Sequence, residues 1–261
     1  MHVTGIMVTL PSRLKMAQLA IADFCRQSHP ERDLLIAHDG DNAFDDLLRR
    51  WVTQAPPCTE TATRIAVHQL GAGQTLGALR NQAVKLARGD LVCQWDDDDR
   101  CHPLRIALQL EALQKANADF CFLSDQLHGF PQERTLVWDD WNDEAYPLNF
   151  VQGTLLGKRE KMPAYPEVPR GEDTGLCLAI LAAGHTITRL RHCGWCYIYT
   201  FHGGNVWDAR HHQAISELKQ MPLAFVTTKK AELRARIGEY IDLAPYAQIR
   251  ASGMLVPLQI P

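Results

Sequence analysis

Four consecutive carboxylates, Asp96 to Asp99, are the residues of this sequence with the clearest potential for chemistry. They follow an apolar segment that ends at Trp95, which predicts a position at the end of a buried strand. In an extended segment alternate side chains face the same way, so Asp96 and Asp98 are expected to converge on one cation. Carboxylate oxygens suit Mg²⁺ or Mn²⁺, ions that usually also hold substrate phosphates. A solvated acidic loop is the alternative, and the strand before the run favours the metal.

Two further groups lie later in the chain. Glu172 and Asp173 begin an expected helix after Arg170-Gly171, where the helix dipole alone would favour carboxylates. Their functional interpretation is a general base that takes a proton from an attacking hydroxyl. His202 precedes Gly203-Gly204, which allow a ligand to approach the backbone closely, so His202 is a candidate metal ligand or phosphate contact. A plain surface histidine is the other interpretation.

The elements that must position these groups follow from periodicity. Apolar runs that start near residues 3, 34, 64, 90 and 119 predict strands, and helical patterns separate them. A spacing of 26 to 31 residues is typical of βαβ units in a doubly wound, mostly parallel α/β sheet. In such sheets ligands bind at the carboxyl ends of the strands. After residue 125 this regular spacing of strands ends. The pattern there predicts short strands, a helix over 172–184 and a helix over 229–241.

Composition excludes several classes of protein. The chain has 261 residues and a net charge of −3, so it lacks the basic excess of a protein that binds nucleic acid through bulk charge. It has no apolar run of the roughly 20 residues that a membrane helix needs, and no secretory signal at its start. The eight cysteines are therefore expected to be reduced core residues.

Taken in order, the motifs resemble those of the family 2 inverting glycosyltransferases. The resemblance covers residues 3–212 and rests on a series of short segments along the chain. These segments are Thr9-Leu10-Pro11-Ser12-Arg13, Ile36-Ala37-His38-Asp39-Gly40-Asp41, Gly77-Ala78-Leu79-Arg80-Asn81, Ala87-Arg88-Gly89-Asp90, the Asp96–Asp99 run with His102-Pro103 and Arg105, Glu172-Asp173, and Tyr199 to Asn205. His38 stands where the family usually has the first of two aspartates, and Asp41 stands where serine is common.

The resemblance implies a GT-A fold, which is a Rossmann-like sheet flanked by helices with a smaller acceptor-side β region and a C-terminal helix. It implies Asp173 and Glu172 as catalytic residues, and Asp98, Asp96 and His202 as ligands of Mg²⁺ or Mn²⁺. The residues that it assigns to the nucleotide sugar are Thr9, Pro11, Arg13, Asp39, Arg80, Asn81, Asp96 and Asp97. A UDP-sugar is the favoured donor, and a glycan or lipid-linked molecule is the implied acceptor. The product would be a surface polysaccharide or another glycan.

We expect one domain over residues 1–228, with a nucleotide-sugar half at 1–101 and an acceptor half at 102–228, followed by a helical tail at 229–261. Four aromatic residues of the acceptor half are candidates for stacking on sugar rings or for packing the domain: Trp138, Trp141, Tyr146 and Tyr165. The expected location is cytoplasmic. The basic residues of the tail helix leave open a peripheral contact with the inner face of the membrane.

Two other classes stay open at this point. A sugar-1-phosphate nucleotidyltransferase is also an α/β protein with an aspartate–metal site, but it typically carries a glycine-rich, arginine-containing loop after its first strand. This chain has Pro11-Ser12-Arg13 there. A non-catalytic carbohydrate-binding protein of the same fold is the other alternative, and the retained Asp96, Asp98 and Glu172-Asp173 argue against it.

Overall fold

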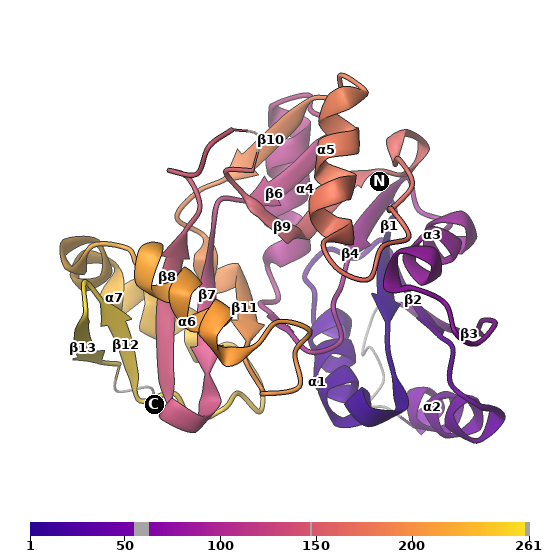
Figure 1. Ribbon diagram of the computed structural model, residues 1–261, viewed down its shortest axis with the longest axis horizontal. Coiled ribbons are helices and arrows are strands. Elements are labelled where there is room, and N and C mark those ends of the chain that lie inside the picture. The colour runs from indigo at the N-terminus through magenta and orange to yellow at the C-terminus, as the bar shows by residue number, and fades with distance from the viewer. Residues whose placement is uncertain (55–62, 147, 259–261) are drawn as a thin grey trace.

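A computed structural model describes residues 1–54, 63–146 and 148–258, and its larger sheet has the order β10-β6-β9-β4-β1-β2-β3 (Figure 1). The predicted strand positions in the first half are confirmed. The strands of this sheet are β1 (Val3–Val8), β2 (Arg32–His38), β3 (Arg64–Gln69), β4 (Leu91–Gln94), β6 (Phe120–Leu123), β9 (Val151–Lys158) and β10 (Ile187–Leu190).

The pairing directions fix where the carboxyl ends of the strands lie. β1 runs parallel to both β2 and β4, and β2 runs parallel to β3. β9 is antiparallel to its neighbours β4 and β6. Residues that follow β1, β2 and β4 therefore share one edge of the sheet, and this edge holds Thr9, Asp39 and Asp96.

Helices cover both faces of the larger sheet. α1 (Leu14–Cys25), α2 (Asn42–Gln54) and α4 (Arg105–Lys115) contribute to one buried cluster, whereas α3 (Leu76–Leu86) and α5 (Glu172–Ala182) contribute to another. Because side chains alternate along a strand, Val3 and Met7 of β1 join the first cluster and Ile6 joins the second. α3 and α5 therefore lie on the same face of the sheet, which brings their N-termini to a shared site.

A smaller sheet has the order β13-β12-β8-β7-β11-β5. Its strands are β5 (Arg100–Cys101), β7 (Asp125–Phe130), β8 (Thr135–Asp140), β11 (Tyr197–Thr200), β12 (Gln248–Ala251) and β13 (Met254–Pro257). The short β5 follows the aspartate run directly and pairs with β11. The aspartate run thus connects the two sheets.

The end of the chain differs from the expected helical tail. Helix α6 (Ala209–Leu218) precedes α7 (Leu223–Ile237), which begins six residues before the predicted position at 229. Beyond α7 the chain forms the hairpin β12–β13, and β12 adds to the smaller sheet by parallel pairing with β8. Among the described residues, no helix combines the length and the apolar character needed to cross a bilayer.

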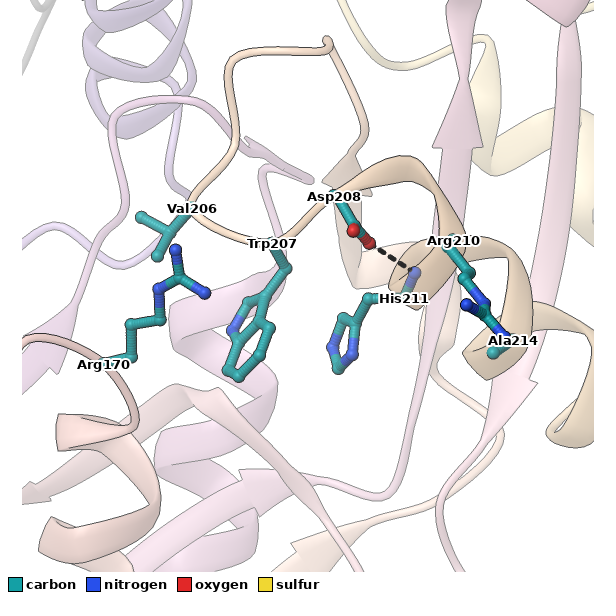
Figure 2. Close-up of a pocket in the computed structure, with 7 residues that line it drawn as sticks. All are labelled: Arg170, Val206, Trp207, Asp208, Arg210, His211 and Ala214. Carbon is teal, nitrogen blue, oxygen red and sulfur yellow. Dashed lines mark hydrogen bonds between the residues drawn. The ribbon is translucent and has the colours of Figure 1, made fainter.

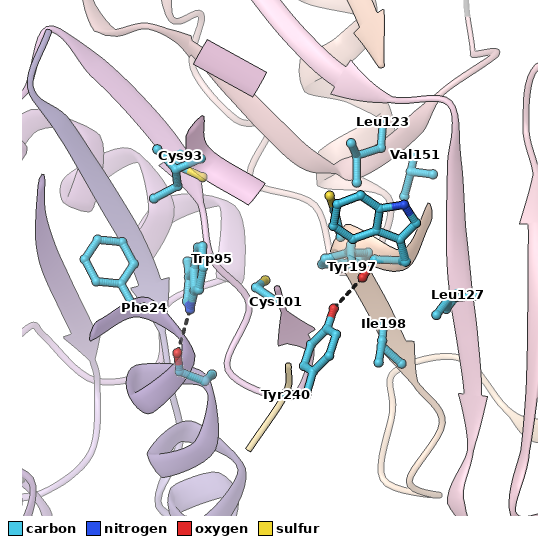
Figure 3. Packing of buried hydrophobic residues seen from close by; sticks show 14 of the residues in the cluster. Phe24, Cys93, Trp95, Cys101, Leu123, Leu127, Val151, Tyr197, Ile198 and Tyr240 are labelled. Atoms are coloured by element: carbon cyan, nitrogen blue, oxygen red, sulfur yellow. Dashed lines mark hydrogen bonds between the residues drawn. The ribbon is translucent and has the colours of Figure 1, made fainter. Parts of the chain in front are cut away.

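One continuous apolar cluster joins the two sheets (Figure 3). Trp95 lies at its centre and is fully buried; its ring meets Phe24 edge to face at a centroid distance of 5.0 Å, and its Nε1 donates to the carbonyl oxygen of Ala20. On the other side, the Tyr240 hydroxyl donates to the carbonyl oxygen of Trp195. Trp95 immediately precedes the aspartate run, so this packing anchors the start of the run.

The expectation of reduced cysteines is wrong for Cys25, which is disulfide-bonded. It holds for six others, which are free and mostly buried: Cys93, Cys101, Cys121, Cys177, Cys193 and Cys196. Cys58 lies outside the described residues. Burial raises the pKa of the free thiols, for example to about 12 for Cys101, so these thiols behave as small core residues.

A buried ion pair ties α1 to the start of the smaller sheet. Asp23 accepts from Arg100 Nε and Nη2 at 2.7 and 3.0 Å and from the backbone N–H of Cys101 at 3.0 Å. Arg100 also donates to the carbonyl oxygens of Ile241 and Asp242, beyond α7. This pair therefore links three distant parts of the chain.

We predict that Asp23→Ala lowers the free energy of unfolding by about 3–5 kcal/mol, because it leaves the Arg100 charge buried without its partner. Urea denaturation measures this loss. The matched control is Asp46→Ala on the exposed surface of α2, expected to change stability by less than about 0.5 kcal/mol. Equal effects of the two variants would contradict the role of the pair.

Candidate functional site

Arg80, on α3, directs its guanidinium at three carboxylates. Its Nη2 donates to Asp96 Oδ1 over 2.7 Å, and its Nη1 donates to Glu172 Oε1 over 2.9 Å. Nη1 also donates to Asp173 Oδ1. The Arg80 side chain is only 6% exposed, so solvent screens these charges weakly. The structure thus brings the aspartate run and the Glu172–Asp173 pair, which are remote in sequence, to one cation.

Pro166 shows why α3 and α5 approach each other here. A Cβ on Gly77 of α3 would lie 2.2 Å from the Pro166 carbonyl oxygen, and a Cβ on Gly175 of α5 would lie 2.5 Å from Pro166 Cγ. The loop that carries Pro166 therefore needs glycine on both helices. Asn81 fastens this loop, since its side-chain amide donates to the Tyr165 carbonyl oxygen and accepts from the Tyr165 N–H. The sequence predicts donor binding for Asn81, but both ends of its amide are engaged by the loop.

The Asp173 carboxyl has a pKa suited to proton transfer. The pKa of Asp173 is raised to about 6 overall, and burial is the largest cause. The positive charge of Arg80 lowers this pKa, whereas the negative charges of Asp96 and Glu172 raise it. Gln94 Nε2 donates to Asp173 Oδ1 over 3.3 Å, which favours the ionised form. Asp173 is therefore mostly ionised at pH 7 yet able to accept a proton, as a general base requires.

Arg13 holds the middle of the aspartate run from the opposite side. Its Nη1 lies 3.0 Å from Asp97 Oδ1 and 2.9 Å from Asp98 Oδ2. Burial and the charge of Asp98 raise the pKa of Asp97 to about 6, against the lowering effect of Arg13. Burial also raises the pKa of Asp98, but the hydrogen bond with His202 and the charge of Arg13 outweigh it and lower that pKa overall.

His202 contacts Asp98 through Nε2, at 3.2 Å from Oδ2. The backbone N–H of Gly204 donates to His202 Nδ1, so Nε2 carries the ring proton and donates to Asp98. In a histidine that binds a metal, the ring nitrogen that does not bind the metal usually carries the proton and donates it, whereas Nδ1 of His202 accepts. The geometry therefore favours His202 as a hydrogen-bond donor that orients Asp98. His212 is buried against His128, and His211 stacks on Trp207, so neither belongs to this group.

The expectation that Asp96 and Asp98 face the same way along an extended segment is wrong. Asp97 and Asp98 form a turn, and the four carboxylates diverge: Asp96 meets Arg80, whereas Asp98 meets Arg13 and His202. Asp99 accepts from the Tyr197 hydroxyl and from the Thr200 N–H, and burial with the charges of Asp98 and Asp96 raises its pKa well above the usual range. Asp99 is thus engaged by the smaller sheet and is a structural residue.

The donor set fits a divalent cation shared with a substrate. Within the described parts of the chain, no group of three or more His, Cys, Asp or Glu side chains is arranged to hold a metal ion alone. Mg²⁺, however, is usually bound by one or two carboxylates plus substrate phosphates. Five carboxyl groups (Asp96, Asp97, Asp98, Glu172 and Asp173) face only two guanidiniums (Arg13 and Arg80), so acidic groups outnumber basic ones at this edge. An anionic ligand at this edge therefore requires an additional cation.

The residues expected to hold a nucleoside line the neighbouring strand ends. Thr9 is buried after β1, and Pro11 begins the exposed 3₁₀ turn η1 (Pro11–Arg13). Asp39, after β2, is partly exposed and accepts from the Gly73 N–H at 3.3 Å. His38 instead points away into the fold, where its Nε2 lies 3.0 Å from Asp45 Oδ1 on α2. His38 is therefore a structural residue, whereas Asp39 presents its carboxylate at this strand end.

Gln94 is a member of this site that the sequence did not indicate. Its Nε2 donates to Asp96 and Asp173, and its Oε1 accepts from the Tyr165 hydroxyl. Its place two residues before Asp96 on the same strand end is the signal that could have revealed it. Among the aromatic candidates, Trp138 and Tyr165 are each 1% exposed and pack the fold, so neither offers a face for stacking on a sugar.

The sequence profile described as Glycosyl transferase family 2 matches residues 6–158, which are 153 of the 261 residues. A comparison with curated protein sequences finds no match.

Solved structures with similar folds include two of S. aureus TarS 1-349. The first has a TM-score of 0.57 at 15% identity, and the match covers 94% of this chain and 81% of the other. The second, in complex with UDP-GlcNAc, has a TM-score of 0.59 at 17% identity, with coverages of 94% and 68%. The mannosyltransferase PcManGT from Pyrobaculum calidifontis, in complex with GDP-Man and Mn²⁺, has a TM-score of 0.60 at 13% identity, with coverages of 91% and 71%. These likenesses confirm the fold class expected from the sequence.

We predict that Arg80→Gln destabilises the protein by about 3–5 kcal/mol at pH 8, because the buried Glu172 and the partly buried Asp96 and Asp173 lose their shared cation. The loss should shrink toward pH 5, since carboxyls with raised pKa values take up protons and the repulsion falls. Adding Asp173→Asn should restore part of the stability at pH 8. Urea denaturation of the single and double variants, with Arg50→Gln on the exposed surface of α2 as control, measures these effects. If Asp173→Asn instead lowered the stability of the Arg80→Gln variant further, Arg80 would not be the cation that neutralises Asp173.

Proposed function

Since this chain belongs to glycosyl transferase family 2 and has the GT-A fold, we propose that it moves a sugar from a nucleotide-diphosphate sugar to an acceptor hydroxyl with inversion of configuration. The observation that carries the proposal is the cluster around Arg80. In this cluster a partly buried carboxylate with a pKa of about 6, Asp173, lies beside the aspartate run at the carboxyl ends of the strands.

In the proposed reaction Asp173 takes the proton of the acceptor hydroxyl. The hydroxyl oxygen then attacks the anomeric carbon from the face opposite the diphosphate. The bond from that carbon to the diphosphate oxygen breaks, and the diphosphate leaves with the bonding electron pair. This single displacement inverts the configuration. Arg80, which also pairs with Glu172, holds Asp173 in place, and its charge favours the ionised form of Asp173 before the proton arrives.

The proposed donor site lies on the Arg13 side of the aspartate run. Thr9, Pro11 and Arg13 flank the nucleotide, Asp39 bonds the base or ribose, and Asp96 and Asp97 lie next to the diphosphate. Asp98 would hold Mg²⁺ or Mn²⁺ together with the substrate phosphates, and the ion when bound would neutralise the leaving diphosphate as a Lewis acid. His202 donates to Asp98 and sets its orientation. The excess of acidic groups at this edge supports such a cation.

The similar structures support a nucleotide-sugar donor as a class. One is named in complex with UDP-GlcNAc and another with GDP-Man and Mn²⁺. We propose a UDP-sugar as the donor and a glycan or lipid-linked molecule as the acceptor, in polysaccharide or other glycan synthesis. We also propose that residues 1–101 bind the donor and residues 102–228 the acceptor, within one unit.

The proposed membrane contact through α7 receives little support from its charges. Lys229 pairs with Glu232, and Arg236 pairs with Glu239 while lying over the Trp195 ring. We interpret this face of α7 as solvated. The cytoplasmic location stays a prediction from the sequence, and the disulfide at Cys25 counts against it, because disulfides are rare in a reducing cytosol.

We predict that Asp173→Asn lowers transfer by about 10²–10⁴-fold, the usual contribution of a general base, while donor binding persists. Donor binding is measured as the rise in melting temperature with UDP-, GDP-, CMP- and dTDP-sugars in the presence and absence of Mn²⁺, because a ligand that binds only the native state raises that temperature. Asp46→Asn is the matched control and should retain transfer. Retained transfer with lost donor binding in Asp173→Asn would overturn the assignment.

The pH profile gives a second prediction. Since the pKa of Asp173 is raised to about 6 and its ionised form is the base, kcat/KM should rise with pH up to about 6 and then level off. The initial rate of transfer between pH 5 and pH 8, at fixed Mn²⁺, measures it. A flat profile over this range would show that a group with a different pKa takes the proton.

A further inference from the structure

A cavity of about 450 Å³ opens beside α6 and is lined by residues from two separate loops (Figure 2). Arg170 comes from the loop before α5. Val206 and Trp207 come from the loop after β11, and Arg210 and His211 from the first turn of α6. None of these residues takes part in the cluster around Arg80.

Trp207 forms the apolar floor of this cavity. Its indole ring stacks on the His211 imidazole at a centroid distance of 4.4 Å, and the Arg170 guanidinium lies 5.4 Å from the centroid of the same ring. Figure 2 shows the three groups in a row. Trp207 is 39% exposed and Val206 is 51% exposed, although both are large apolar residues. The indole ring therefore has His211 on one side and Arg170 on the other, and this contact holds the Arg170 guanidinium at the cavity.

The charges around the cavity favour an anion. Within the described ranges, no carboxylate lies within ion-pair distance of Arg170 or Arg210, whereas Arg13, Arg80 and Arg100 all have such partners. The one carboxylate that lines the cavity, Asp208, caps α6 by accepting from the His211 N–H at 2.9 Å. Two unpaired guanidiniums therefore face the cavity together with the positive end of the α6 dipole.

The two segments that line the cavity also carry, or lie next to, residues of the proposed reaction. Arg170 is separated from Glu172 and Asp173 only by Gly171, whose φ of +79° turns the chain into α5. On the other side, the loop with Trp207 begins at His202, which donates to Asp98. The cavity thus lies between the element that carries the proposed base and the loop that contacts the donor side.

We propose that this cavity binds the acceptor, and that the acceptor is an anionic saccharide whose phosphate or carboxylate binds Arg170 and Arg210. The proposal rests on the function proposed above and specifies the class of its acceptor. Guanidinium groups suit both anions because they form paired hydrogen bonds with either one. The open position of the cavity makes this binding sensitive to salt.

The test is a titration of the full chain, followed by NMR, with three probes at low salt: glucose 6-phosphate, methyl glucuronide and methyl glucoside. At least one anionic probe should bind about tenfold more tightly than the neutral one, and 0.5 M NaCl should reduce this preference. A stronger response to glucose 6-phosphate or to methyl glucuronide supports a phosphate- or a carboxylate-bearing acceptor, respectively. Equal affinity for all three probes, or no binding, overturns the proposal.

Variants locate the binding. Arg210→Gln should lower affinity for the anionic probes about tenfold without affecting the neutral one. Trp207→Ala should weaken the anionic probes, because Trp207 holds the Arg170 guanidinium, and Trp207→Phe should restore most of the loss. Arg50→Gln on α2 is the matched control. An anion preference that survives Arg210→Gln overturns the assignment. The rise in melting temperature of the unmodified chain with nucleotide sugars is measured in parallel. If no nucleotide sugar raises it while the preference for anionic probes holds, the proposed function is wrong although the cavity binds anions.

Discussion

One buried guanidinium, that of Arg80, faces three carboxylates, and the rest of the site depends on this imbalance. A single positive charge cannot neutralise Asp96, Glu172 and Asp173, so each carboxylate keeps part of its repulsion. The repulsion and the burial together raise the pKa of Asp173 to about 6, while Arg80 prevents a larger rise. The same contact couples the proposed base to the strand that carries the aspartate run.

The fold keeps these charges together by means that are not electrostatic. Trp95 anchors the start of the aspartate run in the core shared by both sheets. Gly77 and Gly175 leave room for the Pro166 loop between α3 and α5, and Asn81 binds the backbone of that loop. Packing therefore opposes the repulsion among the carboxylates. A functional site that costs stability in this way needs rigid support from the elements around it.

The sequence predicts the larger sheet well, because β-type runs at regular spacing record the alternation of strands and helices. It predicts the end of the chain poorly, since β12 and β13 are short and gain their stability from pairing with β8, a contact remote in sequence. The same limit applies to the site. Residue types identify Asp96, Asp98 and Asp173, but the divergence of the aspartates and the tautomer of His202 depend on a turn and on the Gly204 N–H. Gln94 and the Arg170–Trp207 stack arise only when distant segments meet.

The central claim is that a single carboxylate base, held by Arg80, drives one displacement at the anomeric carbon. The anomeric configuration of the newly formed product, read by ¹H NMR before it equilibrates, tests this claim most directly. We predict a product whose anomeric configuration is opposite to that of the donor sugar. A product that retains the donor configuration would contradict it, because retention requires a second displacement or a reaction on the same face as the leaving diphosphate.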